Sequence, residues 1–360
     1  MTPHFHRLTI REIRRETGDA VSLAFAVPPE LRDTYRFTQG QHLTLRTRID
    51  GREVRRSYSV CCGVDDYLAD GELRVAVKLV HGGEFSQYVL EHLTSGDAID
   101  VMAPDGRFFT TLDAAHAKHY VAFAAGSGIT PVLSLIKTTL AREPHSRFTL
   151  IFGNRTVDTI LFREQLEDLK NRYLDRFALH HVLSRAQGDV PLNHGRIDAE
   201  KCAAFLEVIP PDTIDEAFIC GPSSMIDVVE AALIAAGVPP HHVHTERFGV
   251  PNGVAPLQPV TVADDGDLAA LTVVLDGKQH ALKLPRHGAS ILDVALAAGL
   301  DLPYACKGGV CCTCRAKILE GSVTMDKNYT LEEEEMAQGF VLTCQSHPTS
   351  DRVLVSFDER

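Results

Sequence analysis

Short runs of alternating polar and apolar residues fill roughly the first third of the chain. They cover residues 42–47, 58–62 and 73–80, and glycines separate them. Alternation turns one face of a strand toward a core, and closely spaced short strands are typical of an antiparallel barrel or sandwich. The pattern therefore predicts an antiparallel β-barrel domain over residues 1–112.

From Lys118 the pattern changes, because continuous apolar runs now alternate with stretches of helical periodicity. The runs expected to form buried parallel strands are 120–125, 148–152, 177–183 and 216–220. The stretches expected to form helices are 131–140, 162–169 and 227–236. Strands that alternate with helices build βαβ units around a parallel sheet, so we predict an α/β domain over residues 113–248.

Residues 249–268 are rich in Pro, Gly and Asp and show little periodicity, which is typical of a linker. After them, Asp276-Gly277 stands between two apolar runs and predicts a β-hairpin. Ser290 then favours the N-cap of a helix that ends at Gly299. A third domain with both helix and strand is therefore predicted for residues 269–360.

Composition narrows the class of protein. Of the 360 residues, 44% are hydrophobic and 23% charged, as expected for a globular protein of two or three domains. No apolar run is long enough for a transmembrane helix, and the N-terminus lacks the apolar segment of a signal peptide. The net charge of −12 argues against nucleic acid or an anionic membrane as partner. Nine cysteines fit a reducing compartment, so we expect a cytoplasmic location.

Four cysteines near the C-terminus have the spacing C-x4-C-x2-C, with the fourth 30 positions later: Cys306, Cys311, Cys314 and Cys344. This spacing is typical of a plant-type [2Fe–2S] cluster, and thiolates are the soft anionic ligands that its iron prefers. Gly308 and Gly309 allow the loop to wrap closely and to direct backbone N–H groups at the sulfurs. A zinc site or buried thiols are the alternatives. Zinc sites usually pair two short C-x2-C units, and only one occurs here.

Other polar residues of these regions are expected to be structural. Cys312 is a fifth thiol within the cysteine loop, where ligand exchange or oxidation is the alternative to a small packed side chain. Thr330 is expected to cap an acidic helix, with Glu333 completing a capping box. A docking patch for a basic partner is the alternative for this acidic run. The cluster of His241, His242 and His244 is expected at the surface.

The stretch Arg56–Ser59 is placed at the start of a predicted strand. Its Arg offers a permanent charge to a phosphate, its Tyr a ring to stack on an isoalloxazine, and its Ser a hydroxyl for the reactive edge of that ring. A surface Arg beside a half-buried strand Tyr is the alternative. Gly82 and Gly83 precede a stretch of helical periodicity. The first N–H groups of such a helix lack partners within it and suit a pyrophosphate. The flavin-binding candidates are Arg56, Ser57, Tyr58, Ser59, Lys78, Val80, Gly82, Gly83, Phe85 and Ser86.

A second set of motifs favours a nucleotide. Gly126, Ser127, Gly128, Ile129, Thr130 and Pro131 follow a predicted strand and open a helix, although the third glycine of the dinucleotide fingerprint is absent. Arg155, Ser184 and Arg185 end two predicted strands. There they suit a 2′-phosphate and favour NADPH over NADH, with solvated arginines as the alternative. Cys220, Gly221 and Pro222 end another strand, where Cys220 lies near a nicotinamide or is a structural thiol. The catalytic candidates are Tyr58, Ser59 and Cys220.

Together, the R-x-Y-S, G-S-G-I-T-P and C-G-P motifs and the C-terminal cysteines resemble the ferredoxin–NADP reductase superfamily, in the layout of oxygenase reductase components. The resemblance covers essentially the whole chain. At 35–45, 152–156, 194–198 and 302–311 it is closer still to the family of reductase subunits that serve phenylacetyl-CoA 1,2-epoxidases, which are bacterial di-iron monooxygenases.

This resemblance implies an FAD-binding barrel, an NADP-binding α/β domain and a C-terminal α+β ferredoxin domain of the β-grasp type. It implies FAD, NADPH and a [2Fe–2S] cluster as cofactors. Arg56, Tyr58, Ser59, Gly83 and Ser86 would hold FAD, and residues 126–131 the dinucleotide. NADPH would give a hydride to the flavin, and single electrons would pass through the cluster to the oxygenase component. The alternatives are a reductase for an aromatic-ring hydroxylating oxygenase and a ferredoxin-type carrier or redox sensor.

Overall fold

The computed structural model describes residues 4–186, 190–249 and 267–359. They form two compact units, one from His6 to Arg247 and the other from Phe248 onward together with the N-terminal end. Apart from its ends, the linker expected at 249–268 lies outside the described residues. No helix in the described ranges is long and apolar enough to cross a membrane.

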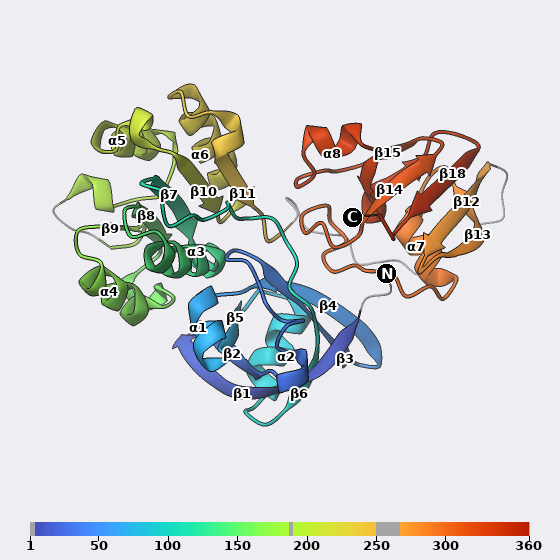
Figure 1. Cartoon of the computed structure of the whole chain (residues 1–360), viewed down its shortest axis with the longest axis horizontal. Helices are drawn as coiled ribbons and strands as arrows, with labels where there is room; N and C mark the ends of the chain where they lie inside the picture. The colour runs from blue at the N-terminus through green and yellow to red at the C-terminus, as the bar shows by residue number, and fades with distance from the viewer. Residues whose placement is uncertain (1–3, 187–189, 250–266, 360) are drawn as a thin grey trace. The chain divides into compact units, whose positions relative to one another are not determined.

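A six-stranded antiparallel sheet forms the first part of the unit that spans His6–Arg247. Its strands, in the order β4-β3-β6-β1-β2-β5, are β1 (Phe5–Thr17), β2 (Ala20–Ala26), β3 (His42–Ile49), β4 (Arg52–Ser59), β5 (Leu73–Lys78) and β6 (Ala98–Met102). The sheet curls into a barrel (Figure 1), because Val60 just after β4 pairs with Val75 on the opposite edge strand. Helices α1 (Val64–Asp70) and α2 (Glu84–His92) lie in its connections. The predicted antiparallel barrel is confirmed.

The stretch Arg56–Ser59 lies at the end of β4, so the prediction that it starts a strand is wrong. A tight hairpin turn through Asp50 and Gly51, with φ of +50° and +78°, lets β4 begin already at Arg52. Asp tolerates the left-handed region and Gly adopts it freely, which is typical of a two-residue hairpin. The turn therefore moves the whole motif to the far end of its strand.

The second part of the same unit is a parallel sheet with helices on both faces (Figure 1). Its strands, in the order β11-β10-β7-β8-β9, are β7 (His119–Ala125), β8 (Arg147–Asn154), β9 (Phe177–Leu183), β10 (Glu216–Cys220) and β11 (Val243–Glu246). The helices are α3 (Ile129–Arg142), α4 (Arg163–Arg172), α5 (Ala199–Val208) and α6 (Ser223–Ala235). This confirms the predicted α/β sheet, to which the structure adds α5 and β11.

Alternate residues of β7 supply two separate cores. Tyr120 and Ala122 pack in the core that contains residues of α3 and α4, whereas Val121 and Phe123 pack with α5 and α6. Successive strand residues point to opposite faces, so a strand covered on both sides must be apolar throughout. This explains the continuous apolar run from which the strand was predicted.

Charged pairs join the barrel to the parallel sheet. On α1, Asp65 contacts Arg142 at 2.8 Å and Asp66 contacts Lys137 at 3.2 Å, and both partners lie on α3. Paired surface charges contribute modestly to stability, but they fix the register of two helices. They therefore help to align the barrel with the sheet.

The unit that begins at Phe248 contains a five-stranded mixed sheet with helix α7 (Ile291–Ala297). Its strands, in the order β13-β12-β18-β14-β16, are β12 (Leu268–Leu275), β13 (Lys278–Pro285), β14 (Arg315–Glu320), β16 (Phe340–Leu342) and β18 (Arg352–Ser356). Strands β15 (Val323–Met325) and β17 (Ser346–Pro348) form a separate pair. The predicted hairpin turn at Asp276-Gly277 and the predicted N-cap at Ser290 are confirmed.

The acidic helix α8 (Glu333–Ala337) begins later than predicted. Its N-cap is Glu332 rather than Thr330, and the Glu335 carboxylate accepts the Glu332 N–H at 3.2 Å. Asn328 Oδ1 accepts the N–H groups of Thr330 and of the next residue, at 3.2 and 2.8 Å. An Asn side chain that bonds the backbone in this way holds a turn, so the helix cannot start before Glu332.

A buried carboxylate joins three strands at the amino-terminal edge of the parallel sheet. Glu216 accepts hydrogen bonds from Lys118 Nζ at 2.8 Å and His244 Nε2 at 2.9 Å. Burial would raise the pKa of Glu216, but the bonds from His244 and Lys118 outweigh it and hold the pKa at about 2. The His244 ring also stacks on Phe218, with centroids 4.7 Å apart. The expected surface position is therefore wrong for His244, although His241 is exposed.

We expect Glu216→Gln to lower the free energy of unfolding by about 1–3 kcal/mol near neutral pH, because Lys118 and His244 lose an ionised acceptor. A carboxylate with a depressed pKa stabilises the fold above its ordinary pKa of 4.5, and this contribution is lost as pH falls toward about 2. The variant should therefore lose less stability over that interval. Urea unfolding followed by circular dichroism at several pH values measures this.

The matched control is Glu207→Gln, which changes an exposed carboxylate on α5 of the same domain. An equal pH dependence in the wild type and in Glu216→Gln would contradict the assignment of the depressed pKa.

Candidate functional site

The end of β4 presents an aromatic ring and an exposed guanidinium. Tyr58 is half-buried, and its ring lies 5.7 Å from that of Phe85, centroid to centroid. Burial raises the pKa of Tyr58, so its hydroxyl stays protonated. Arg56 is exposed and donates to the carbonyl of Arg55 at 2.7 Å. The strand therefore offers a stacking surface beside a cation, and Ser57 lies between them.

The loop before α2 forms a compact cradle. Ser86 Oγ accepts the N–H of Val80 at 3.1 Å and donates to the carbonyl of Gly83 at 3.0 Å. A Cβ on Gly83 would lie 2.8 Å from the Val80 Cβ, so this N-cap position requires glycine. The first N–H groups of a helix lack intrahelical acceptors and bind anions. The cradle thus fits the pyrophosphate of a dinucleotide.

The residues around this cradle differ in the contacts that their side chains already make within the protein. Gly82 has a φ of +71°, which glycine adopts at little cost. Lys78 lies 3.5 Å from Asp19 and is therefore directed to a carboxylate of the barrel. Arg52 contacts Glu84, the first residue of α2, at 2.7 Å. This ion pair, which no sequence motif indicates, ties the start of β4 to the cradle.

Ser59 meets a residue that sequence reasoning missed. Its Oγ donates to Glu246 Oε2 at 3.0 Å, although the two residues are 187 positions apart. Glu246 ends β11 and lies beside Cys220, which ends β10 in the parallel register. The side chains of Ser59, Cys220 and Glu246 therefore belong to one cluster between barrel and sheet. An acidic residue at the end of an unassigned strand was the only sequence signal.

The electrostatic environment of this cluster disfavours negative charge. Glu246 keeps some accessible surface, but the protein packed around its carboxyl raises its pKa to about 8, against the hydrogen bond from Ser59, which lowers it. Burial also raises the pKa of the Cys220 thiol, with the nearby Glu246 adding to the shift. At neutral pH both groups are therefore protonated and uncharged.

The two nucleotide motifs of the sheet pack directly against each other. A Cβ on Gly128 would lie 2.0 Å from the carbonyl oxygen of Cys220, so the turn after β7 touches the turn after β10. Gly126 has a φ of +55°, and Thr130 Oγ1 donates to the Ser127 carbonyl at 3.0 Å. Ile129, Pro131, Gly221 and Pro222 complete these two turns. They form one continuous backbone surface at the carboxyl edge of the sheet.

The arginines of the next two strands also end at this edge. The backbone N–H of Arg185 donates to the Arg155 carbonyl at 2.9 Å, and that of Ser184 donates to the Asn154 carbonyl at 2.9 Å. Arg155, Ser184 and Arg185 are all exposed. The Asn154 side chain is buried, and its Nδ2 has no hydrogen-bond partner among the described residues. Two cations and a hydroxyl thus lie side by side where parallel strands usually bind ligands.

Three of the four cysteines, Cys306, Cys311 and Cys314, lie in the loop between α7 and β14, and Cys344 lies in the turn after β16. The backbone N–H of Gly308 donates to Cys306 Sγ at 3.3 Å, and that of Cys306 donates to Cys311 Sγ at 3.5 Å. Gly309 has a φ of +78°, and a Cβ there would lie 2.9 Å from the Lys327 carbonyl oxygen. The predicted need for glycine in the loop is therefore confirmed at Gly309.

The four thiols form two pairs. The thiol of Cys311 and backbone N–H groups of the loop lower the pKa of Cys306 to about 6. In the second pair, a hydrogen bond from Cys314 lowers the pKa of Cys344. Among the residues that the structure describes, no group of three or more His, Cys, Asp or Glu is arranged around a single metal ion. Two pairs of thiols fit a cluster in which each of two irons takes two cysteines.

Cys312 belongs to neither pair. It has a φ of +53°, and its Sγ lies 3.0 Å from Thr330 Oγ1, in the turn that precedes α8. All nine cysteines are free of disulfides. Cys61, Cys62 and Cys202 are buried and pack as small side chains in the cores.

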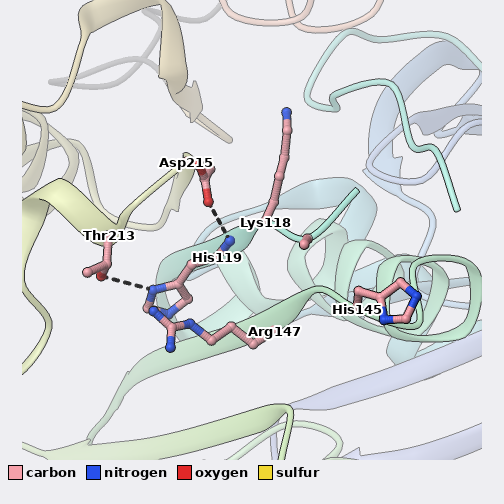
Figure 2. A pocket seen from close by; sticks show the side chains of 7 residues that line it. Lys118, His119, His145, Arg147, Thr213 and Asp215 are labelled. Atoms are coloured by element: carbon pink, nitrogen blue, oxygen red, sulfur yellow. Dashed lines mark hydrogen bonds between the residues drawn. The ribbon is translucent and has the colours of Figure 1, made fainter. Parts of the chain in front are cut away.

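A separate depression lies at the opposite edge of the parallel sheet. It has a volume of about 310 Å³ and is lined by Ala117, Lys118, His119, His145, Arg147, Thr213 and Asp215. Figure 2 shows that the His119 backbone N–H bonds the Asp215 carboxylate and its ring bonds Thr213. These contacts lie at the amino ends of the strands, away from the motifs assigned to the nucleotide.

Three families match successive parts of the chain. Residues 7–110 match the oxidoreductase FAD-binding domain, and residues 123–231 match the oxidoreductase NAD-binding domain. Residues 273–349 match the 2Fe-2S iron-sulfur cluster binding domain. The expected cofactor classes are therefore confirmed as FAD, a pyridine nucleotide and a [2Fe–2S] cluster.

Full-length relatives have the same order of domains. The chain is 48% identical over 357 residues to a subunit of the 1,2-phenylacetyl-CoA epoxidase of Escherichia coli, covering 99% of this chain and 98% of that protein. It is 38% identical over 366 residues to the ferredoxin reductase component of 3-ketosteroid-9-alpha-monooxygenase from Mycobacterium tuberculosis, covering 99% and 97%.

Solved structures share the fold. Phthalate dioxygenase reductase superposes with a TM-score of 0.59 and 23% identity, covering 98% of both chains. An intact type IV self-sufficient cytochrome P450 monooxygenase superposes with a TM-score of 0.70 and 21% identity, covering 98% of this chain and 41% of that one. Together with the full-length relatives, these findings show that the chain belongs to the family of oxygenase reductase components, oxidoreductases with FAD-binding, NAD-binding and [2Fe–2S] domains.

Proposed function

We propose that this chain takes electrons from NADPH and passes them, through FAD and a [2Fe–2S] cluster, to the oxygenase component of a phenylacetyl-CoA epoxidase. The observation that carries this proposal is the 48% identity to a subunit of that enzyme, which extends over almost the full length of both chains. FAD can accept a hydride and release single electrons, which the cluster accepts one at a time. The residues of the chain bind, orient and electrostatically tune these groups.

The barrel residues fit a flavin. Tyr58 offers its ring face to the isoalloxazine, and Arg56 offers a charge to a phosphate. The cradle of Gly83 and Ser86 offers helix N–H groups to the pyrophosphate. Ser57, Lys78, Val80, Gly82 and Phe85 flank these contacts, and the side chain of Val80 is 62% exposed.

The cluster of Ser59, Cys220 and Glu246 fits the place of hydride transfer. Ser59 lies next to Tyr58 on the flavin strand, and Cys220 ends a strand of the nucleotide sheet. A nicotinamide that crosses from the sheet to the barrel would therefore meet both. The neutral Glu246 fixes the Ser59 hydroxyl without adding negative charge beside a flavin that gains electrons.

The sheet edge fits NADPH. The turn at Gly126–Pro131 offers a glycine-rich approach to a pyrophosphate, as does the contact with Cys220–Pro222. Arg155, Ser184 and Arg185 offer two charges and a hydroxyl to a 2′-phosphate. NADH has only a hydroxyl at the 2′ position, so two arginines strengthen its binding less than that of NADPH.

We also propose the domain limits and the location. The flavin domain covers 1–112, the nucleotide domain 113–248, the linker 249–268 and the ferredoxin domain 269–360. The family matches at 7–110, 123–231 and 273–349 support these limits. Nine cysteines free of disulfides support a reducing, cytoplasmic location.

A second candidate function is a reductase for a different oxygenase. It is favoured by the 38% identity to the 3-ketosteroid-9-alpha-monooxygenase reductase component, again over nearly the full length. Reconstitution separates the two candidates. The purified chain should support NADPH-dependent epoxidation of phenylacetyl-CoA by the epoxidase oxygenase component, and no such turnover with an active oxygenase would contradict the first candidate.

We expect Cys344→Ser to remove the electron paramagnetic resonance signal of the reduced cluster and to abolish electron delivery to the oxygenase. NADPH-dependent ferricyanide reduction should persist, because FAD alone supports it. The control is Cys312→Ser, which alters a thiol of the same loop that belongs to neither pair. A cluster signal of wild-type intensity in Cys344→Ser would refute the assigned ligand set.

We expect Arg185→Gln to lower kcat/KM for NADPH about ten- to a hundredfold while leaving that for NADH nearly unchanged, since one charge-assisted contact contributes roughly 1.5–3 kcal/mol. Steady-state kinetics with both nucleotides measures this difference. Arg172→Gln, at the end of α4, serves as the control for loss of a surface charge. Equal losses with the two nucleotides would count against a 2′-phosphate contact.

We expect the rate of flavin reduction by NADPH to fall as pH rises through about 8, the pKa of Glu246, because an ionised carboxylate opposes electron gain by the neighbouring flavin. Below that pH the carboxyl is neutral and the rate should be constant. Anaerobic stopped-flow bleaching of the flavin measures it. In Glu246→Gln the side chain cannot ionise, so a decline that persists with the same midpoint would rule out Glu246 as its origin.

A further inference from the structure

An ion pair lies directly beside the cysteine loop. Lys307, which follows Cys306 in sequence, places its Nζ 3.2 Å from Oδ1 of Asp293 on α7. The side chains of Lys307 and Asp293 are only 17% and 20% exposed. The ammonium also lies over the ring of Tyr304, 4.9 Å from its centroid. A cation that would be free to enter solvent is thus held at the loop by an anion and an aromatic face.

The backbone of Lys307 is also fixed. Its φ is +51°, in the left-handed region that lysine rarely adopts. Its carbonyl accepts a hydrogen bond from Gln345 Nε2 at 3.1 Å, and Gln345 follows Cys344. Glycine or asparagine would adopt this conformation at lower cost, and a long side chain loses rotamer entropy when it is held. Because both effects make lysine costly at this position, its presence indicates that the charge of its side chain has a role.

Asp293 performs two separate tasks with its two oxygens. Oδ2 accepts the Ser290 hydroxyl at 2.7 Å and so completes the N-terminal cap of α7. Oδ1 accepts Lys307. The start of α7 is therefore coupled to the cysteine loop through a single carboxylate.

Resting on the proposed function, we propose that Asp293 is a positioning residue that holds the Lys307 ammonium in a charge-balanced pair, in which each charge cancels the shift that the other would impose on the reduction potential of the cluster. Four thiolates make the bound cluster an anion, and the electron that it accepts from the flavin adds a further negative charge with no proton. A nearby cation favours the reduced form and a nearby anion opposes it. The pair keeps these two effects close to balance.

Removing one or the other charge of the pair is expected to shift the midpoint potential of the cluster in opposite directions. Asp293→Asn removes the anion but leaves an oxygen for Ser290, so the midpoint potential of the cluster should rise. Lys307→Gln leaves Asp293 unbalanced, so the potential should fall. In the double variant the charges cancel again, and the potential should return close to the wild-type value. Potentiometric titration of the cluster signal by electron paramagnetic resonance, on the full-length holoprotein, measures all three.

Asp351→Asn is the matched control, because Asp351 pairs with Arg286 on the same domain and is 95% exposed. The midpoint potential of the cluster should not change in this variant. Unchanged potentials in both single variants, or shifts of both in the same direction, overturn the inference. If Asp293→Asn fails to hold a cluster, Lys307→Gln alone decides, since a potential that does not fall overturns it. A wild-type protein that yields no [2Fe–2S] signal would instead overturn the proposed function itself.

Discussion

The hydrogen bond between Ser59 and Glu246 joins the two parts of the unit on which the proposed flavin and nucleotide sites lie. It joins the last residue of β4 to the last residue of β11, and so joins the barrel to the sheet at the point where both present their chemistry. The ion pairs between α1 and α3 align the same two parts at a second place. The hydrophobic core that Cys61 and Ala76 share with α3 joins the same two parts as well, so barrel and sheet are held together at several places.

The parallel order of the sheet places the rest of the site. Strands β7, β8, β9, β10 and β11 all run in one direction, so their carboxyl ends meet at one edge. This is why Gly128 touches the Cys220 carbonyl and why Arg185 bonds to Arg155, although each pair is distant in sequence. The opposite edge holds the Glu216 ion pairs and the depression of Figure 2, away from these turns.

Sequence alone predicted those features that local chemistry determines. The strand at 177–183, the turn at Asp276-Gly277 and the cap at Ser290 depend on neighbouring residues, and each lies where it was predicted. Glu246 was missed because a single carboxylate after a four-residue strand has no local pattern, and only the parallel register brings it to Ser59. The start of α8 was misplaced because Asn328 accepts the N–H groups of Thr330 and Leu331 and so holds both residues in a turn before the helix. Spacing predicted the grouping of the four cysteines, but not Asp293, which approaches the loop from α7.

Glu246 and Asp293 show two solutions to one electrostatic problem. A centre that gains electrons is opposed by a carboxylate nearby, yet both positions need carboxyl oxygens to accept hydrogen bonds. At Glu246 the surrounding protein keeps the group protonated, so it accepts from Ser59 without charge. At Asp293 the group accepts from Ser290, and its charge is offset by Lys307. The first solution depends on the raised pKa of Glu246, and the second depends on an ion pair. The chain therefore places a neutral carboxyl between barrel and sheet and a charge-paired one beside the cysteine loop.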